Sequence, residues 1–366
     1  MTSRRNILIA GGKTGGHLFP GIAVAQALQR LQPGVKILFV GTSAPFEVST
    51  LKTYGFDHTS ISAHPVKGRG LFTKLYGLAM TLVSLCQSFV IILRFKPDFV
   101  LGVGGFSSFA VVLAAWILRV PTAIQEQNAI PGITNRILSR FCGTVFTSFA
   151  STRGLAHNPR TRFSGNPVRE KGPVQDMDVP WFTDIRPQDF IILVTGGSQG
   201  ASSINQAVAD MAQHLKDCDD LFLIVQTGAA DENRIKKAFL SLEIRARVQA
   251  FFHNMPALLD KADLVICRAG AGTLSELALK GVPAILVPYP HAADDHQRFN
   301  ARSLADKGAA LVMADKNLSG HALGQAVMAL KSDPDQRQRM AAAMKQMARP
   351  HAADHIAAHI LDIKET

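Results

Sequence analysis

One local pattern begins twice in this chain, once at its start and once near its middle. Residues 6–12 (NILIAGG) and 190–197 (FIILVTGG) are each a short apolar run that ends in glycines, and a helical stretch follows each of them, at residues 18–31 and 203–215. An apolar strand, a glycine turn and a helix, in this order, open an α/β domain with a parallel sheet. Because single cores stop growing beyond about 250 residues, the 366 residues fit two such domains.

Further apolar runs extend both halves of the chain. They alternate with helical stretches and lie at residues 37–40, 99–103, 122–124, 221–225, 264–267 and 284–287. Continuous apolar strands separated by helices are typical of parallel sheets that are covered on both faces. Residues 165–187 are rich in proline and charge and break both patterns. We therefore predict a first domain at residues 1–164 and a second at 165–349.

The composition favours a globular protein that stays in the cytoplasm. Hydrophobic residues make up 47% of the chain and charged residues 18%, which argues against disorder. The N-terminus is basic but reaches glycines after four apolar residues, which is too few for a signal peptide. We expect neither a disulfide framework nor a zinc site, because the cysteines have no paired spacing. They are Cys86, Cys142, Cys218 and Cys267.

The positive charge is confined to the first half. Residues 1–165 hold 17 lysines and arginines against four acidic residues, a balance of +13, whereas the rest holds 22 against 24, a balance of −2. This asymmetry indicates an anionic partner for the first domain, either nucleic acid or an anionic membrane surface, unless the cations simply cover a solvated surface. We expect no nucleic acid, because this half has no recognisable binding module and no aromatic residues interleaved with its cations.

Two windows in the first half, residues 75–93 and 99–118, lack charged residues over about the 20 positions that cross a bilayer. The second contains Gly102, Gly104 and Gly105, which predicts a buried strand, a glycine turn and a core helix. In the first, apolar residues at positions 75, 78, 82, 85, 89 and 92 share one helical face. This predicts an amphipathic helix that either binds a membrane surface or packs on the core. The flanking cations are Lys67, Arg69, Lys74, Arg94 and Lys96.

Four glycine-rich loops lie at residues 11–16, 102–105, 196–200 and 270–273. Glycines after a strand let backbone N–H groups approach a phosphate while the next helix presents its positive end. The loops could therefore hold a diphosphate without a metal, or they could be tight turns needed for packing. Neither nucleotide fingerprint is complete, since Ile7 stands where a P-loop needs its first glycine and Ser107 where a dinucleotide motif needs its third.

No pattern indicates a metal or another cofactor. A divalent ion on a diphosphate is usually held by an Asp-x-Asp pair just after a strand. The three such pairs here, at residues 176/178, 217/219 and 333/335, lie in the domain boundary, before a strand and in a late loop. We therefore expect neither a metal nor a cofactor.

Three side chains are candidates for chemistry or binding. Glu276 follows a strand and a glycine loop, where it could grip a ribose diol, or it could form a capping box with Thr273. Arg268 could pair with a phosphate or with a neighbouring carboxylate. His17 opens a helix, which favours a neutral imidazole and suits a general base, although a histidine there can also be a cap.

Six ordered motifs resemble those of the MurG family of glycosyltransferases, and the resemblance covers essentially the whole chain. They are Gly15-Gly16-His17 with Pro20, Glu126-Gln127-Asn128, GNPVR at 165–169, GGSQGA at 196–201, CRAGAGTLSE at 267–276, and His296-Gln297 before Asn300-Ala301. The resemblance implies a GT-B fold, in which two Rossmann-like domains with parallel sheets face each other across a cleft. It also implies that a final helix, here at residues 350–366, crosses back to the first domain.

The activity that the resemblance implies is an inverting transfer of N-acetylglucosamine. The donor would be UDP-N-acetylglucosamine and the acceptor lipid I, undecaprenyl-pyrophosphoryl-N-acetylmuramoyl-pentapeptide, at the cytoplasmic face of the cell membrane beside other cell-wall enzymes. Alternatives are a transferase with another lipid acceptor such as diacylglycerol, a UDP-sugar epimerase of the same fold, and a non-catalytic membrane scaffold. The presence of both the His17 and the Glu276 motifs argues against the scaffold.

The resemblance further implies individual roles. His17 would be the catalytic base, Phe252 would contact the uracil through its backbone, Glu276 the ribose, and Gln297 the sugar. The full set of implied donor-binding residues is Thr14, Gly15, Gly16, Asn128, Arg169, Ser198, Gln199, Phe252, Arg268, Ala271, Gly272, Thr273, Glu276, His296 and Gln297. The chain departs from the family at Lys13, where glycine is common, and at Gln125, where histidine is common.

Overall fold

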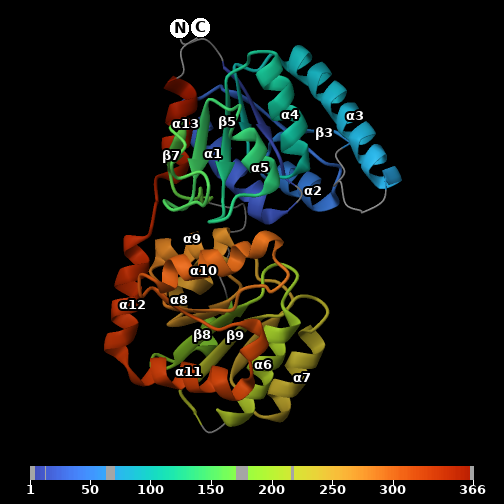
Figure 1. Cartoon of the computed structure of the whole chain (residues 1–366). Helices are drawn as coiled ribbons and strands as arrows, with labels where there is room; N and C mark the ends of the chain where they lie inside the picture. The colour runs from blue at the N-terminus through green and yellow to red at the C-terminus, as the bar shows by residue number, and fades with distance from the viewer. Residues whose placement is uncertain (1–4, 13, 63–70, 170–179, 216–217, 363–366) are drawn as a thin grey trace. The chain divides into compact units, whose positions relative to one another are not determined.

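The chain folds into two compact units, each built on one parallel sheet. The computed structural model describes residues 5–12, 14–62, 71–169, 180–215 and 218–362. Residues 1–173 together with 349–366 form the first unit, and residues 174–348 form the second. In each unit helices cover both faces of the sheet (Figure 1). The predicted α/β class with two Rossmann-like domains is therefore confirmed.

The first sheet has the strand order β3-β2-β1-β4-β5-β6-β7, and every neighbouring pair is parallel. Its strands are β1 Asn6–Ala10, β2 Lys36–Gly41, β3 Asp57–Ser60, β4 Phe99–Gly102, β5 Thr122–Glu126, β6 Thr144–Thr147 and β7 Thr161–Phe163. Its helices are α1 Gly15–Leu31, α2 Pro45–Thr53, α3 Leu71–Phe95, α4 Phe106–Ile117, α5 Ile133–Leu138 and α13 Ala352–Asp362.

Strand β1 is apolar and buried from Ile7 to Ala10, because both faces of this sheet are covered. Ile7 and Ile9 pack in one cluster with α1 and α13, whereas Leu8 and Ala10 pack in another with α4. Successive side chains of a strand point to opposite faces, so an unbroken apolar run suits a strand that is covered on both sides. The last helix, α13, thus completes the core of the first unit beside α1 (Figure 1).

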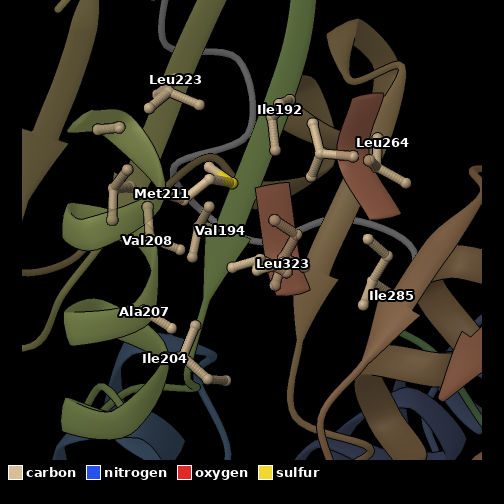
Figure 2. Close-up of a cluster of buried hydrophobic side chains, with 14 of the residues drawn as sticks. Ile192, Val194, Ile204, Ala207, Val208, Met211, Leu223, Leu264, Ile285 and Leu323 are labelled. Atoms are coloured by element: carbon tan, nitrogen blue, oxygen red, sulfur yellow. The ribbon is translucent and has the colours of Figure 1, made fainter. Parts of the chain in front are cut away.

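The second sheet has the order β10-β9-β8-β11-β12-β13 and is also parallel throughout. Its strands are β8 Phe190–Thr195, β9 Leu221–Gln226, β10 Ala246–Gln249, β11 Leu264–Cys267, β12 Ala284–Leu286 and β13 Ala310–Val312. Its helices are α6 Ser202–His214, α7 Glu232–Ser241, α8 Met255–Lys261, α9 Ala271–Lys280, α10 His296–Ala305, α11 Gly320–Ser332 and α12 Pro334–Gln346, with short 3₁₀ turns η1 Pro180–Asp184, η2 Ala293–Asp295 and η3 Asp315–Asn317. Figure 2 shows its core, where Ile192 and Val194 of β8 pack with Met211 of α6 and Leu323 of α11.

The uncharged window at residues 99–118 is strand β4, a glycine turn and helix α4, as predicted. Within the parts of the chain that the structure describes, no helix combines the length and the apolar character that crossing a bilayer demands.

Helix α3 differs from the amphipathic helix that was predicted, because apolar side chains lie on both of its sides. Those packed toward the core are Leu85, Phe89, Ile91, Ile92 and Phe95, and the large exposed ones are Leu82, Val83, Val90 and Leu93. Ser84 and Ser88 are buried, which their hydroxyls permit by donating to the carbonyls of Met80 (2.8 Å) and Ser84 (2.7 Å) within the helix. Of the predicted flanking cations, Lys67 and Arg69 lie outside the described residues, and so does the side chain of Lys74.

Candidate active site

The four glycine loops lie at the two points where strand order reverses. The chain leaves β1 toward β2 and later continues on the other side with β4, and it does the same at β8 and β11. The loops at residues 11–16, 102–105, 196–200 and 270–273 each begin at, or within three residues of, the end of one of these four strands. In open α/β sheets, ligands bind beyond the carboxyl ends of the strands at such a reversal. Each unit therefore has one candidate ligand site with two glycine loops.

Some of these glycines are required by the fold itself. Gly11, Gly104 and Gly200 have positive φ, and a Cβ on Gly11 would overlap the carbonyl oxygen of Gly104. Gly16 and Gly272 are different, because their φ is not positive and a Cβ there would meet nothing within 4 Å. Packing thus explains the first three positions but not Gly16 and Gly272, where the structure leaves room for a side chain.

His17 is not the cap of helix α1. The N-cap is Thr14, whose hydroxyl lies 3.1 Å from Nδ1 of His17. The half-buried imidazole packs against Gly104 of the second loop, where a Cβ would lie 2.6 Å from Cδ2 and 3.0 Å from Nε2. When Nδ1–H donates to Thr14, Nε2 carries the lone pair that a general base needs.

The loop after β5 that carries Asn128 is shaped by the buried carboxylate of Glu126. This carboxylate accepts hydrogen bonds from the backbone N–H of Asn128 (2.9 Å), the backbone N–H of Gly132 (3.1 Å) and Nδ2 of Asn135 (2.9 Å). Burial raises the pKa of Glu126, and these hydrogen bonds offset part of that rise. The supporting roles of Glu126 and Asn135 were not predicted, since only their three-dimensional partners reveal them.

Gln125, which stands where the family commonly has histidine, lies in the same buried region as Glu126. Its Nε2 donates to the hydroxyl of Ser148 (2.9 Å) and to Oδ1 of Asn166 (3.3 Å). Gln127 donates through Nε2 to the carbonyl of Val103 (2.8 Å), which links the end of β5 to the glycine loop after β4. Gln125 is therefore part of the scaffold beneath the loops. Lys13, the other departure, lies outside the described residues.

Arg169 belongs to the first unit in this structure. Its guanidinium carbon lies 4.0 Å from the ring centroid of Phe19 in α1, and its NH1 donates to the hydroxyl of Tyr54 (2.9 Å). Stacking on an aromatic face and one directed hydrogen bond together hold a long flexible side chain in one orientation.

In the second unit, Ser198 and Gln199 are exposed in the glycine loop after β8. Phe252 is buried in the loop after β10, and its backbone N–H donates to Oε1 of Gln226 (2.9 Å). Any uracil contact by the Phe252 backbone would therefore use its carbonyl group.

The capping-box alternative for Glu276 is wrong. Helix α9 begins at Ala271 with Gly270 as its N-cap, so Thr273 lies inside the helix and Glu276 lies in the second turn. The half-buried Glu276 is close to the end of β11. Burial, with a smaller contribution from the Glu276 charge, raises the pKa of Cys267 to about 12. Glu276 thus lies near the carboxyl end of β11, where open α/β sheets bind a ribose, and ribose binding remains its predicted role.

Of its two predicted partners, a phosphate or a neighbouring carboxylate, Arg268 pairs with a carboxylate in this structure. Its NH1 lies 2.5 Å from Oδ1 of Asp315, and its NH2 donates to the hydroxyl of Ser203 (2.9 Å). Burial alone would raise the pKa of Asp315, but hydrogen bonds from Arg268 and Ser203 lower it overall. In this conformation Arg268 links α6 to η3, the turn after β13.

His296 and Gln297 open helix α10 after a strained turn. Asp294 and Asp295 have φ of 50° and 55°, which is unfavourable for residues other than glycine and concentrates at functional sites. Gln297 accepts through Oε1 from the backbone N–H groups of Ala269 (3.1 Å) and Tyr289 (3.0 Å). It therefore joins the loop after β11 to the loop after β12.

The predicted site residues are thus divided between the two units. The group of the first unit is Thr14, Gly15, Gly16, His17, Asn128 and Arg169, and the group of the second is Ser198, Gln199, Phe252, Arg268, Ala271, Gly272, Thr273, Glu276, His296 and Gln297. Among the described residues, no three His, Cys, Asp or Glu side chains are grouped so that they could hold a metal ion.

Comparison with known proteins gives a consistent answer. Residues 7–147 match the glycosyltransferase family 28 N-terminal domain, and residues 191–356 match the family 28 C-terminal domain. A protein of Anaeromyxobacter sp. (strain Fw109-5) named UDP-N-acetylglucosamine–N-acetylmuramyl-(pentapeptide) pyrophosphoryl-undecaprenol N-acetylglucosamine transferase is 42% identical over 352 residues, which cover 96% of this chain and 91% of that protein. The protein of the same name from Myxococcus xanthus (strain DK1622) is 40% identical over 358 residues, 98% of this chain and 92% of that one.

A solved structure agrees with these relatives. The crystal structure of Acinetobacter baumannii MurG matches with a TM-score of 0.79 and 28% identity, covering 98% of this chain and 100% of that one. Together with the two parallel-sheet domains, these matches define a glycosyltransferase of the GT-B class. The chain therefore belongs to glycosyltransferase family 28, in its MurG branch.

Proposed function

We propose that this enzyme transfers N-acetylglucosamine from UDP-N-acetylglucosamine to undecaprenyl-pyrophosphoryl-N-acetylmuramoyl-pentapeptide, converting lipid I to lipid II in peptidoglycan synthesis. The observation that carries the proposal is the identity of about 40% with relatives named for this reaction, which extends over both domains.

The proposed chemistry divides the work between the two groups of residues. The second unit would hold the uridine diphosphate, with Glu276 on the ribose and the N-terminus of α9 at the phosphates, where backbone N–H groups and the helix dipole favour negative charge. His17 in the first unit would take the proton from the acceptor hydroxyl as its oxygen attacks the anomeric carbon. The bond to UDP breaks, and the configuration at that carbon inverts. The charge that develops on the leaving diphosphate would be stabilised by the glycine-loop amides.

Transfer of labelled sugar tests this proposal. Purified protein with labelled UDP-N-acetylglucosamine should label a lipid-pyrophosphoryl-muramoyl-pentapeptide analogue and release UDP. Labelling of diacylglycerol instead would identify a different lipid acceptor. Conversion of UDP-N-acetylglucosamine to its epimer without any acceptor would show an epimerase and contradict the proposal.

We also propose that the first unit docks on the anionic cytoplasmic face of the cell membrane through α3. The exposed apolar side chains of this helix are Leu82 (56% exposed), Val83 (45%), Val90 (46%) and Leu93 (61%). Figure 1 shows α3 on the outer side of α4, and Trp116 at the end of α4 is exposed as well. Arg94 and Lys96 at the end of α3 are exposed cations. Apolar area combined with cations, each worth about 1 kcal/mol near an anionic surface, suits reversible docking.

Vesicle co-sedimentation tests the docking. Leu82→Gln with Leu93→Gln should weaken binding to vesicles rich in anionic lipid, as should Arg94→Gln with Lys96→Gln. Leu240→Gln is a matched control, because Leu240 is 78% exposed on α7 of the second unit. Binding that is indifferent to anionic lipid and salt, or equally weakened in the control, would contradict this role of α3.

A further inference from the structure

Gln226, the last residue of β9, connects two loops of the second unit. Its side chain is buried, with 2% of its surface exposed. Nε2 donates to the carbonyl of Gly197 (3.0 Å) and to the hydroxyl of Thr195 (3.2 Å), while Oε1 accepts from the backbone N–H of Phe252 (2.9 Å). Gly197 lies in the glycine loop after β8 and Phe252 in the loop after β10. One side chain thus ties together the ends of three adjacent strands, β10, β9 and β8.

The partners determine which way the amide faces. A carbonyl oxygen only accepts and a backbone N–H only donates, so Nε2 must face Gly197 and Oε1 must face Phe252. An ionised glutamate would keep the acceptor for Phe252 but lose the donor for Gly197. A methionine of similar length would lose both. The position therefore requires a side chain with a donor and an acceptor at its end, as glutamine has.

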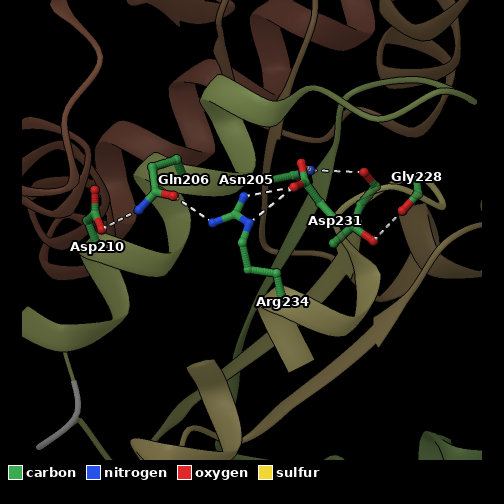
Figure 3. A network of polar contacts seen from close by, with 7 residues as sticks. Asn205, Gln206, Asp210, Gly228, Asp231 and Arg234 are labelled. Carbon is green, nitrogen blue, oxygen red and sulfur yellow. Dashed lines mark hydrogen bonds and ion pairs between the residues drawn. The ribbon is translucent and has the colours of Figure 1, made fainter. Parts of the chain in front are cut away.

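The glycine loop after β8 also rests directly on the segment that follows Gln226. A Cβ on Gly200 would overlap the carbonyl of Thr227, and a Cβ on Gly228 would overlap the carbonyl of Gln199. Asn205 holds this segment from α6 by donating to the carbonyl of Thr227 (2.9 Å) and to Oδ2 of Asp231 (2.9 Å). Figure 3 shows the network, in which Arg234 also bonds to Asp231 (2.9 Å). The support beneath the loop is therefore held in place.

We infer that Gln226 is a positioning residue that sets the spacing between the glycine loop at 196–200 and the loop of Phe252, so that the base and the diphosphate of a uridine nucleotide bind as one unit. This inference rests on the proposed function, in which glycine-loop amides stabilise the diphosphate, and on the uracil contact of the Phe252 backbone that the family resemblance implies. Gln226 acts through these two loops and the end of β8, because its amide is buried and bonds to Gly197, Thr195 and Phe252.

Two variants distinguish the role of the Gln226 donor from that of its acceptor. Calorimetric titration of the full-length protein gives its affinity for uridine and for UDP. Gln226→Met should weaken both by about tenfold, as expected when two or three buried hydrogen bonds are lost and partners are left unpaired. Gln226→Glu should leave uridine binding within about twofold but weaken UDP by about tenfold, because the Phe252 contact is kept and the carbonyl of Gly197 then faces a carboxylate.

A matched control distinguishes positioning from general stability. Val327→Ala removes fully buried atoms of the same core on α11 without touching either loop, so it should lower the melting temperature with UDP affinity unchanged. The inference is overturned if UDP affinity in Gln226→Met stays within twofold of wild type, or falls no further than in Val327→Ala. If Gln226→Met does not fold, equal losses of uridine and UDP in Gln226→Glu overturn it. Failure of the wild-type protein to bind either ligand would instead refute the proposed function, and the inference with it.

Discussion

The glycine loops after β1 and β8 begin with the same strand-to-helix turn but are supported by different chemistry. The first rests on Glu47 of α2, which is fully buried and accepts from the backbone N–H (3.1 Å) and the hydroxyl (2.7 Å) of Thr42. Its carboxylate fills the space beside Gly12 and Gly41, where a Cβ would overlap it. The second loop rests on the neutral amide of Gln226. The ionisable imidazole of His17 directly follows the first loop, and the second loop has no ionisable side chain. This difference fits the proposed division between proton transfer and nucleotide binding.

The largest expected effect comes from removing the proposed base beside the first loop while the second loop is left unchanged. His17→Ala should lower turnover by about 10² to 10⁴, the usual loss of a general base. UDP affinity should stay nearly unchanged, because the proposed nucleotide contacts lie in the second unit. Steady-state kinetics and UDP titration measure the two quantities separately. Turnover within a few-fold of wild type would leave His17 without a catalytic role.

The next effect concerns binding in the second unit. Glu276→Ala should weaken donor affinity by about 1.5 to 3 kcal/mol, the contribution of hydrogen bonds to a charged group. Because Glu276 does not cap α9, the melting temperature should change little. Donor titration and thermal unfolding of the same preparation check both points. A lower melting temperature with unchanged donor affinity would assign Glu276 a structural role instead.

A third effect tests the Glu47 carboxyl group that supports the first loop. In Gly12→Ala the new methyl group would overlap the buried Glu47 carboxylate, so unfolding free energy should fall by about 1 to 3 kcal/mol, as in other overpacked sites. Chemical denaturation measures it. Gly132→Ala is the control, because a Cβ at Gly132 would meet nothing within 4 Å and its φ is not positive. Equal losses in both variants would contradict the proposed role of Glu47.

The sequence could predict those strands that are buried on both faces and are therefore mostly apolar. β11 has the predicted bounds, and β1 and β8 begin at the predicted residues. β3 (DHTS) and β7 (TRF) lie at the two edges of the first sheet and are too polar to be recognised. The inward orientation of Ser84 and Ser88 was also missed, because a hydroxyl that bonds within its own helix can be buried at little cost.

For the candidate site, too, the sequence could predict some residues but not others. His17 and Glu276 lie in motifs, and both could be named from sequence. Gln226 could not, because its significance comes from Gly197 and Phe252, which are distant from it in the chain, and a single buried amide at a strand end leaves no periodic signal. Only folded contacts show that Arg268 bonds to Asp315.

The smallest expected effect tests the contrast between glycines that the fold requires and glycines that we expect a ligand to require. Gly16 lies in the first turn of α1 and Gly272 in the first turn of α9, with space around each for a methyl group. Alanine is about 1 kcal/mol better than glycine within a helix, and slightly less near its end, so Gly16→Ala and Gly272→Ala should each raise unfolding free energy by about 0.5 to 1 kcal/mol. Both should nevertheless lose activity, because the methyl group would occupy space that the substrate needs. Denaturant titration alongside the transfer assay tests this pairing. Full activity in the stabilised variants would show that no ligand approaches these two positions closely.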